Sequence, residues 1–235
     1  MTPITVGQKF PTVTLNLPGR TLNTATLTEG RTVVFFGLPG AFTPTCSSSH
    51  VPRYEELYAS FQAVGVDDIV CISVNDEFVM KAWGRDQGVK NVTLLADGNG
   101  TLTDALGLLV DKDALGFGKR SWRYALVVTD GVVTHTFIEP VRDGDPYETS
   151  DADTVLEGLG GTRPPDVVLV GRHGCKYCTK ARADLTEAGI PFDEVQSGPR
   201  RLRAMSGRTT TPQIFIDGVH IGGSDDLSVW LAARS

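Results

Sequence analysis

Short apolar runs rich in β-branched and aromatic residues recur along the first two thirds of the chain, separated by longer segments of mixed polarity. A run of this kind is typical of a buried strand. Three of them are TVVFFG at 32–37, DIVCISV at 68–74 and VTLLAD at 92–97. Two further β-rich runs lie within 122–139 on either side of Asp130-Gly131, and a dipeptide of this type between two such runs predicts a hairpin.

Helices are expected between these strands, at about 45–64, 76–88 and 101–109. Pro44 fits the first turn of the first helix, where its missing N–H leaves no hydrogen bond unmade. Pro52 lies well inside the same helix and should kink or restart it. Strands that alternate with helices, followed by one hairpin, predict an α/β layered fold with a mixed sheet.

The composition changes between residues 142 and 165, where Asp, Gly, Pro and Thr predominate. TVLEGLG could close the first domain as one or two helical turns, and GGTRPP is typical of a linker. We therefore expect a first domain over residues 1–160, a linker at 161–165 and a second domain over 166–235.

The second domain shows the same alternation on a smaller scale and shares no motif with the first. Its expected order is a strand VVLVG, a helix CTKARADLTEAG ending at Gly189, a strand PFDEV, a basic helical stretch PRRLRAMSG, a hairpin around Asp217-Gly218, and a last helix for which Ser224 is the expected N-cap.

The 235 residues carry a net charge of −6, which argues against a nucleic-acid binder or a basic membrane-surface protein. No apolar run approaches the roughly 18–20 residues that a membrane-spanning helix needs. The start, MTPITVGQKFPTV, lacks the basic and apolar regions of a secretory signal. Four cysteines are too few for a disulfide scaffold, so we expect a cytoplasmic protein in a reducing compartment.

Two of the cysteines form Cys175-Lys-Tyr-Cys178, which follows a strand and opens a helix. The N–H groups of a helix N-terminus stabilise a thiolate at Cys175, and Arg172 and Lys176 add positive charge nearby. Cys178, one turn further on, can then attack a mixed disulfide formed on Cys175. The alternatives are an inert pair or half of a zinc site, but zinc normally takes four ligands, and this domain offers only two histidines and no second cysteine pair.

Three motifs of this domain, CKYC, RTTTPQIF at 208–215 and GGSDDL at 222–227, occur in the order found in glutaredoxins. Residues 166–235 resemble that family along essentially their whole length. The resemblance implies a cis peptide bond between Thr211 and Pro212, with the Thr211 backbone pairing with bound glutathione. It also implies that N–H groups in the GGSDD turn bind a glutathione carboxylate. The implied glutathione-binding residues are Arg172, Tyr177, Arg208, Thr211, Pro212, Gly223, Ser224 and Asp225.

The stretch PGAFTPTCSSSH, at 39–50, places a third cysteine at the mouth of a helix. Because Pro44 pre-sets the first turn, the N–H groups of Thr45 and Cys46 can converge on one point and form an oxyanion site. The Thr43 hydroxyl can turn toward the Cys46 sulfur or toward a bound oxygen. Such a pocket suits a thiolate that attacks an O–O bond, because the donors stabilise the charge that grows on the leaving oxygen.

A cation is also needed for charge compensation, and Arg123 is the candidate. In SWRYALVV it alternates with Ala125 and Val127, which places it on a face that otherwise looks buried, and a buried arginine requires a partner. An ordinary surface arginine at a strand start is the alternative.

PGAFTPTCS, together with the downstream RYALVV and DGVV, resembles the peroxiredoxins whose motif begins Pro-Gly-Ala-Phe-Thr-Pro. The resemblance covers about residues 3–160. It implies that Cys46 is the peroxidatic cysteine, that Thr43 and Arg123 position peroxide and favour the thiolate, and that Pro39 shields the pocket, which Thr45 also lines. Both domains would then have a thioredoxin-like fold, each a mixed central sheet flanked by helices.

Peroxide attack leaves a sulfenic acid at Cys46, which must be reduced before further oxidation traps it. The other cysteine of the first domain, Cys71, lies in DIVCISV and is expected to be a buried apolar residue, with a resolving thiol as the alternative. We therefore hypothesise that glutathione condenses with oxidised Cys46 and that Cys175 removes it, with Cys178 or a second glutathione completing the cycle.

The expected function is thus a glutathione-dependent thiol peroxidase acting on hydrogen peroxide and alkyl hydroperoxides. No bound cofactor is expected, and glutathione is the reducing co-substrate. The expected partners are hydroperoxides, glutathione and further copies of the chain in a dimer or tetramer, without nucleic acid or membrane. A general disulfide or glutathione-mixed-disulfide reductase, a glutathione-ligated iron–sulfur carrier and a redox sensor remain alternatives. The sequence leaves open the preferred peroxide, whether thioredoxin can replace glutathione, and whether the domains react within one chain.

Overall fold

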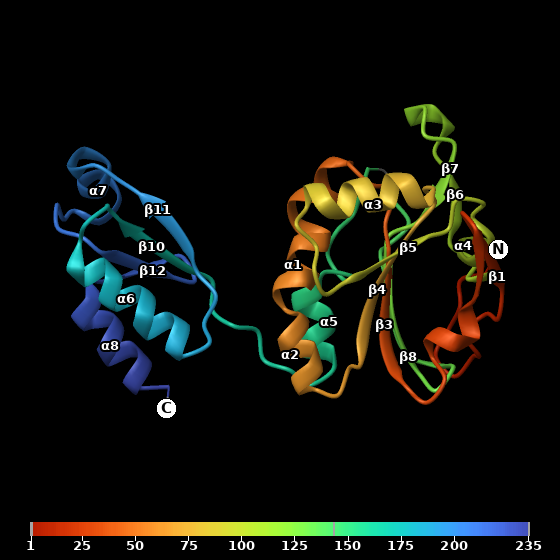
Figure 1. The fold of residues 1–235 in the computed structure, drawn as a ribbon, viewed down its shortest axis with the longest axis horizontal. Coiled ribbons are helices and arrows are strands. Elements are labelled where there is room, and N and C mark those ends of the chain that lie inside the picture. Colours follow the sequence, from red (N-terminus) through yellow and green to blue (C-terminus); the bar gives the residue numbers. More distant parts are fainter. Residues whose placement is uncertain (1, 143, 235) are drawn as a thin grey trace. The chain divides into compact units, whose positions relative to one another are not determined.

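The computed structural model describes residues 2–142 and 144–234. The chain divides between Arg163 and Pro164 into two compact units, shown in Figure 1. This division falls within the segment 161–165 that is predicted to be the linker. Each unit is a mixed sheet with helices packed on it, so the predicted thioredoxin-like α/β class is confirmed.

The first unit is built on a five-stranded sheet with the order β5-β4-β3-β8-β9. The first three of these strands are parallel, and β8 and β9 run antiparallel. Their bounds are β3 Thr32–Gly37, β4 Asp68–Ser73, β5 Thr93–Ala96, β8 Tyr124–Thr129 and β9 Val132–Ile138. The central strands are almost continuously apolar because helices and loops cover both faces of the sheet.

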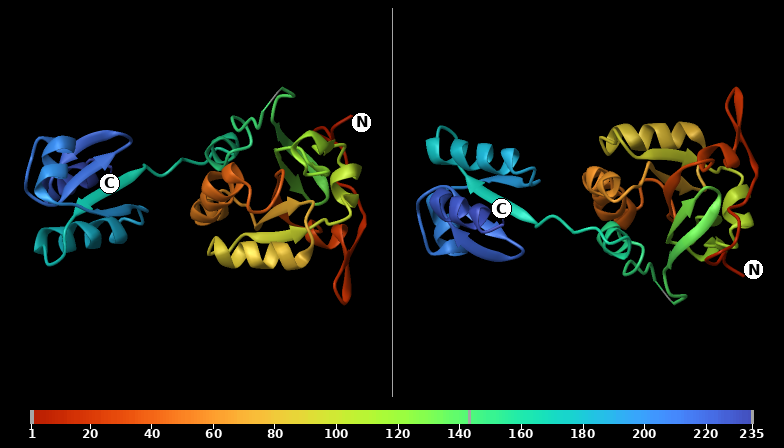
Figure 2. Two further views of the ribbon diagram at one scale, coloured as in Figure 1. Left: turned by 90° about the horizontal axis from the view of Figure 1, so that it is seen from above. Right: turned by 90° about the horizontal axis from the view of Figure 1, so that it is seen from below.

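Four helices pack on one face of this sheet, and α4 packs on the other face with the N-terminal hairpin (Figures 1 and 2). The first group is α1 Val51–Glu56, α2 Tyr58–Ala63, α3 Glu77–Asp86 and α5 Ala152–Gly158. The second is α4 Thr101–Ala105 with β1 Thr14–Leu17 and β2 Arg20–Asn23. Short 3₁₀ turns lie at Thr24–Leu27 and Asp113–Leu115.

The segment predicted as one helix over 45–64 is divided into three pieces. A five-residue π-helix covers Cys46–His50, α1 follows it directly, and Leu57 separates α1 from α2. Pro52 lies in the first turn of α1, so the prediction that it restarts the helix is confirmed.

Two hairpins of the first unit were not predicted. One is β1–β2, and the other joins β6 Leu109–Asp111 to β7 Lys119–Ser121. The first carried a usable signal in Pro18-Gly19, since Gly19 has a φ of +75°. The two predicted Asp-Gly hairpins are confirmed. In each, both turn residues have positive φ, as a type I′ turn requires.

The second unit has a four-stranded sheet with the order β11-β10-β12-β13, in which β10 and β11 are parallel and the other pairs antiparallel. The strands are β10 Val167–Gly171, β11 Asp193–Gln196, β12 Gln213–Ile216 and β13 Val219–Gly222. The helices are α6 Lys176–Glu187, α7 Pro199–Ser206 and α8 Ser224–Ala232. A core of Cys178, Ala181 and Leu185 from α6 and Leu227 from α8 joins these two helices to the sheet.

The prediction that Ser224 is the N-cap of α8 is wrong by one residue. The N-cap is Gly223, and Ser224 is the first helical residue. Glycine has no side chain with which to cap, and the Asp226 carboxylate accepts the Gly223 N–H over 2.7 Å instead. In the part of the chain that the structure describes, no helix combines the length and apolarity needed to cross a membrane.

Candidate redox-active sites

Cys46 lies where the chain leaves the central strand β3 and enters the helical segment. After β3 the backbone is held to β4 by a bond from the Leu38 N–H to the Ile72 carbonyl, and it then turns through residues 39–45. The sulfur-bearing residue is completely buried. Thr45 and Cys46 lie in the first helical turn, where backbone N–H groups have no acceptor within the helix. This is the local arrangement that the sequence predicts.

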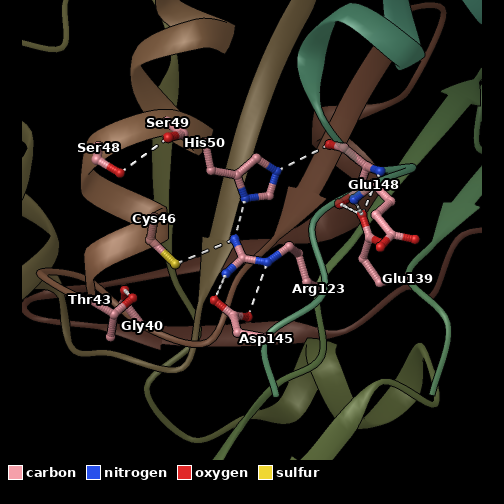
Figure 3. A network of polar contacts seen from close by, with 11 residues as sticks. Gly40, Thr43, Cys46, Ser48, Ser49, His50, Arg123, Glu139, Asp145 and Glu148 are labelled. Atoms are coloured by element: carbon pink, nitrogen blue, oxygen red, sulfur yellow. Dashed lines mark hydrogen bonds and ion pairs between the residues drawn. The ribbon is translucent and has the colours of Figure 1, made fainter. Parts of the chain in front are cut away.

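Arg123 reaches the Cys46 sulfur from the start of β8, and it is 1% exposed. Its Nη1 lies 3.6 Å from Cys46 Sγ (Figure 3). On its other side, Asp145 accepts from Nε over 3.3 Å and from Nη2 over 2.5 Å. Burial disfavours the charged guanidinium, but Asp145 and Cys46 outweigh it and raise the pKa of Arg123. The alternative of an ordinary surface arginine is therefore wrong.

His50 completes this network, although its position one helical turn after Cys46 favours a capping or packing role over contact with the site. Its Nδ1 lies 2.9 Å from Arg123 Nη1, and its Nε2 lies 3.2 Å from the Ser150 carbonyl (Figure 3). Because a carbonyl only accepts, Nε2 carries the proton and Nδ1 accepts from Arg123. Burial and the charge of Arg123 lower the pKa of His50 well below 6.5, against the effect of the Ser150 bond. The imidazole is therefore neutral near pH 7.

The loop after β9 covers Arg123 and His50. Besides the Asp145 carboxylate, it supplies the ring of Tyr147, which lies 5.0 Å from the His50 ring and 5.4 Å from the Arg123 guanidinium. The loop is held from inside by Glu139, whose Oε1 accepts the backbone N–H groups of Glu148, Thr149 and Ser150 and the Ser150 hydroxyl. Burial opposes ionisation of Glu139, but these bonds outweigh it and lower its pKa.

Thr43 is oriented differently from the expectation. Its hydroxyl donates to the Gly40 carbonyl over 2.8 Å and not to the Cys46 sulfur. Because its proton is used on the Gly40 carbonyl, the threonine oxygen keeps only its acceptor capacity. Pro39 is buried at the start of the same loop, and Thr45 is half-buried directly before Cys46.

Cys71 is fully buried in β4 and belongs to the same core cluster as Cys46. Burial raises the pKa of the Cys71 thiol well above its ordinary value, and the neighbouring Cys46 adds to the effect. The prediction of a buried apolar residue is confirmed.

Cys175 is the N-cap of α6, and its sulfur accepts the Cys178 N–H over 3.2 Å and the Thr211 hydroxyl over 3.4 Å. Burial opposes ionisation of the thiol, but hydrogen bonds from Cys178, Thr211 and the Tyr177 N–H outweigh it and lower the pKa of Cys175. The pKa of Cys178 is raised, chiefly by burial. The first cysteine is thus the better nucleophile of the pair, as the sequence predicts.

Among the causes that lower the pKa of Cys175, hydrogen bonds are the largest. The expected effect of the Arg172 and Lys176 charges stays a prediction. The Lys176 ammonium lies over the Tyr177 ring, 4.9 Å from its centroid. Arg172 acts on the pair through its backbone, by a hydrogen bond that favours the thiolate of Cys178.

The residues that the resemblance assigns to glutathione all lie in the second unit, and the structure gives local contacts for some of them. The peptide bond between Thr211 and Pro212 is cis, as implied, and a Cβ on Gly223 would lie 3.7 Å from the Pro212 carbonyl oxygen. Arg208 approaches the same corner through a 3.6 Å ion pair with Asp226. Ser224 is buried, and the side chains of Arg172, Tyr177 and Asp225 are exposed. Within residues 2–142 and 144–234, no group of three or more metal-ligating side chains comes together.

Two family models match the chain. Redoxin matches residues 5–156, which is more than half of the chain, and Glutaredoxin matches residues 167–221. The chain is 48% identical to the hybrid peroxiredoxin hyPrx5 of Haemophilus influenzae, over 96% of this chain and 98% of that protein. It is 57% identical to the peroxiredoxin sll1621 of Synechocystis, over 59% of this chain and 75% of that one.

The first unit is also similar to solved structures. Reduced Prx3 from Vibrio vulnificus superposes with a TM-score of 0.63 at 43% identity, over 67% of this chain and 99% of that chain. The same protein in complex with H₂O₂ gives a TM-score of 0.62 at 43% identity, over 66% and 99%.

Proposed function

This chain belongs to the redoxin family, as a peroxiredoxin with a C-terminal glutaredoxin domain, and from that premise we propose how its peroxidase cycle runs and what reduces it. The peroxidase activity follows from the family. The roles of the individual residues and the use of glutathione are the proposal. The observation that carries it is the Arg123 guanidinium, which lies 3.6 Å from a buried Cys46 sulfur.

In the first step the Cys46 thiolate attacks one oxygen of a hydroperoxide. An S–O bond forms, the O–O bond breaks, and the sulfur gives up two electrons. The leaving alkoxide or hydroxide takes up a proton, and Cys46 becomes a sulfenic acid. Arg123 and the N–H groups of the first helical turn stabilise the charge on the leaving oxygen. Thr43, whose own proton is used on Gly40, accepts a hydrogen bond from the peroxide.

In the second step glutathione condenses with the sulfenic acid and releases water, which leaves a mixed disulfide on Cys46. The Cys175 thiolate attacks the glutathione sulfur, so that Cys46 returns as a thiolate and the glutathione passes to Cys175. A second glutathione then releases it as glutathione disulfide. Alternatively, Cys178 releases it as glutathione and forms a disulfide with Cys175, which two further glutathione molecules reduce to the dithiol with formation of glutathione disulfide. Cys71 is a poor resolving thiol because burial raises its pKa, which supports an external reductant. This dithiol cycle needs a reducing compartment, so a cytoplasmic location is part of the proposal.

A dimer or tetramer is also part of the proposal. Three exposed aromatic side chains of the first unit support it: Phe42 is 54% exposed, Phe78 72% and Phe117 40%. Arg120 brings their segments together, since it bonds the Val74 carbonyl, contacts the Phe117 ring and lies against the loop that carries Phe42. Burying these rings against a second copy would remove them from water.

The test is peroxide consumption coupled to NADPH through glutathione and glutathione reductase. Cys46→Ser is expected to abolish turnover, because no sulfenic acid can form. Cys175→Ser is expected to abolish glutathione-driven turnover while leaving one stoichiometric reduction of peroxide. Cys71→Ala serves as the matched cysteine control and should keep turnover. Normal turnover of Cys175→Ser with glutathione alone would contradict the relay.

A second candidate activity is the reduction of glutathione mixed disulfides on other proteins. It is favoured by the fact that Cys175, Cys178 and Thr211 form a hydrogen-bonded site entirely within the second unit. Cys46→Ser should then still release glutathione from a glutathionylated peptide at the wild-type rate, whereas Cys175→Ser should not.

A further inference from the structure

A chain of hydrogen bonds runs from the end of β4 to the loop that precedes Cys46. Ser73, the last residue of β4, is fully buried, and its hydroxyl donates to Asn75 Oδ1 over 2.7 Å. The same amide oxygen accepts the Ala41 N–H over 3.1 Å. A single oxygen atom of Asn75 therefore accepts from two donors, and it connects the buried end of β4 to the loop.

The backbone on either side of Asn75 is fixed. Before it, the Val74 carbonyl accepts from Arg120 Nη1 over 2.8 Å. After it, Asp76 caps α3, and its carboxylate accepts the N–H groups of Phe78 and Val79 over 2.8 and 2.9 Å. The side-chain amide of Asn75 thus contacts the loop from a backbone segment that hydrogen bonds fix on both sides.

The loop residue next to Ala41 sets the position of Thr43. The Gly40 carbonyl accepts both the N–H and the hydroxyl of Thr43, over 3.4 and 2.8 Å (Figure 3). Asn75 and Thr43 both border Gly40, since a Cβ at this position would be in ordinary van der Waals contact with Asn75 Oδ1 at 3.7 Å and with Thr43 Cγ2 at 3.5 Å. The Thr43 carbonyl in turn accepts the N–H of Ser47, one residue after Cys46. A shift at Ala41 would therefore move Thr43 relative to the sulfur.

We propose that Asn75 is a positioning residue for the reaction of Cys46 with peroxide. Its amide oxygen holds the Ala41 N–H and so fixes the turn that presents Thr43, although no hydrogen bond in the described parts of the chain joins Asn75 to Cys46, Thr43 or Arg123. The inference rests on the proposed role of Cys46 as the oxidised thiol. Its effect is on alignment, because the contact between Arg123 and the sulfur does not involve the loop.

This role predicts that two reactions of the same sulfur respond differently to Asn75→Ala. Oxidation by H₂O₂ needs the peroxide aligned between Thr43 and Cys46, and a displacement of about 1 Å can slow such a reaction roughly 100-fold. Alkylation by iodoacetamide needs only an accessible thiolate. We expect the stopped-flow rate constant for H₂O₂ to fall roughly 10- to 100-fold, while the alkylation rate constant stays within about twofold.

Further variants sharpen the test, all in the full-length protein. Asn75→Asp keeps an oxygen that accepts from both Ser73 and Ala41, so it should recover most of the H₂O₂ rate. Asn99→Ala is the matched control, because Asn99 lines the same surface cavity of about 560 Å³ as Asn75 but bonds no residue of the loop. Should Asn75→Ala fail to fold, as judged by circular dichroism, Asn75→Ser and Ser73→Ala take its place with the same expected split.

A wild-type H₂O₂ rate in Asn75→Ala, or in both replacement variants, would overturn the proposal. An equal fall in both rate constants would overturn it too, because a general loss of structure or of thiolate explains that result. Failure of the proposed function is distinguishable, since Cys46→Ser would then consume H₂O₂ as fast as the wild-type protein, whatever happens at Asn75.

Discussion

At the scale of single residues, the environment of the Cys46 sulfur depends on one arginine that donates hydrogen bonds to three partners at once. Arg123 donates toward the Cys46 sulfur, the His50 imidazole and the Asp145 carboxylate. A planar guanidinium with five donors can do this at once, and the ammonium group of lysine cannot. Its orientation depends on an acceptor at His50 Nδ1, which exists only while the imidazole is neutral.

The lowered pKa of His50 therefore predicts how the stability of the first unit changes with pH. Because the folded state holds the pKa of His50 well below the 6.5 of the unfolded chain, the unfolded state binds the extra proton first as the pH falls. The contribution is complete above pH 6.5 and is lost progressively below it. We expect the unfolding temperature of the first unit, followed by calorimetry, to fall from pH 7 to pH 5.5. In His50→Asn, which keeps an acceptor but does not titrate, the fall should be smaller. An identical pH dependence in both proteins would show that His50 does not titrate in this way.

At the scale of elements, the loop after β9 is ordered by a carboxylate rather than by strand or helix. Glu139 follows β9 and gathers three successive N–H groups and a hydroxyl on one oxygen. The Ser150 carbonyl that this fixes then accepts from His50 and from the Tyr54 hydroxyl. The loop thus couples the end of the sheet to the helix that carries Cys46.

Glu139→Ala should consequently destabilise the first unit strongly. It leaves the buried N–H and hydroxyl of Ser150 and two part-buried N–H groups without this acceptor, so we expect a loss of roughly 3 kcal/mol in the free energy of unfolding. Urea denaturation measures this loss. Glu148→Ala, a neighbouring carboxylate that is 52% exposed, is the control and should change the value by less than about 0.5 kcal/mol. A Glu139→Ala value within 1 kcal/mol of the wild type would contradict the role assigned to this carboxylate.

At the scale of the whole molecule, two units with separate cores carry two different thiol chemistries. Cys46 is enclosed in one unit, and Cys175 is accessible at a helix start in the other. If the proposed relay runs within one chain, the linker makes the reaction of the two units intramolecular, and short flexible tethers give effective concentrations on the order of millimolar. The fusion is therefore expected to increase glutathione-driven turnover most when the protein is dilute.

Cleavage of the linker tests this expectation. A protease site placed within residues 161–165 allows the same preparation to be assayed before and after cutting, at about micromolar protein. Glutathione-driven turnover should drop several-fold on cleavage, because the second unit then acts at its bulk concentration instead of the millimolar level of a tether. The protein with the site left uncut is the control. Turnover that survives cleavage unchanged would mean that the tether contributes nothing to the cycle.

The amino-acid sequence by itself determined the features that depend on neighbouring residues. A proline in the first turn and a cysteine after it specify a helix start at Cys46, and the same holds for the strand–CKYC–helix order around Cys175. The Asp-Gly turns fix two hairpins because both residues must adopt positive φ. The buried runs of β3 and β4 follow from their apolar composition. These are local backbone preferences, which a short stretch of sequence carries in full.

Only the tertiary structure decided which side chains meet. Arg123 is 73 positions from His50 and 77 from Cys46, and Ser150 is 100 positions from His50. Sheet order and the covering loop bring them together. The same holds for Asn75 and Ala41, which are 34 positions apart. Hydrogen bonds act over about 3 Å, so they depend on packing between distant segments, which no local pattern encodes.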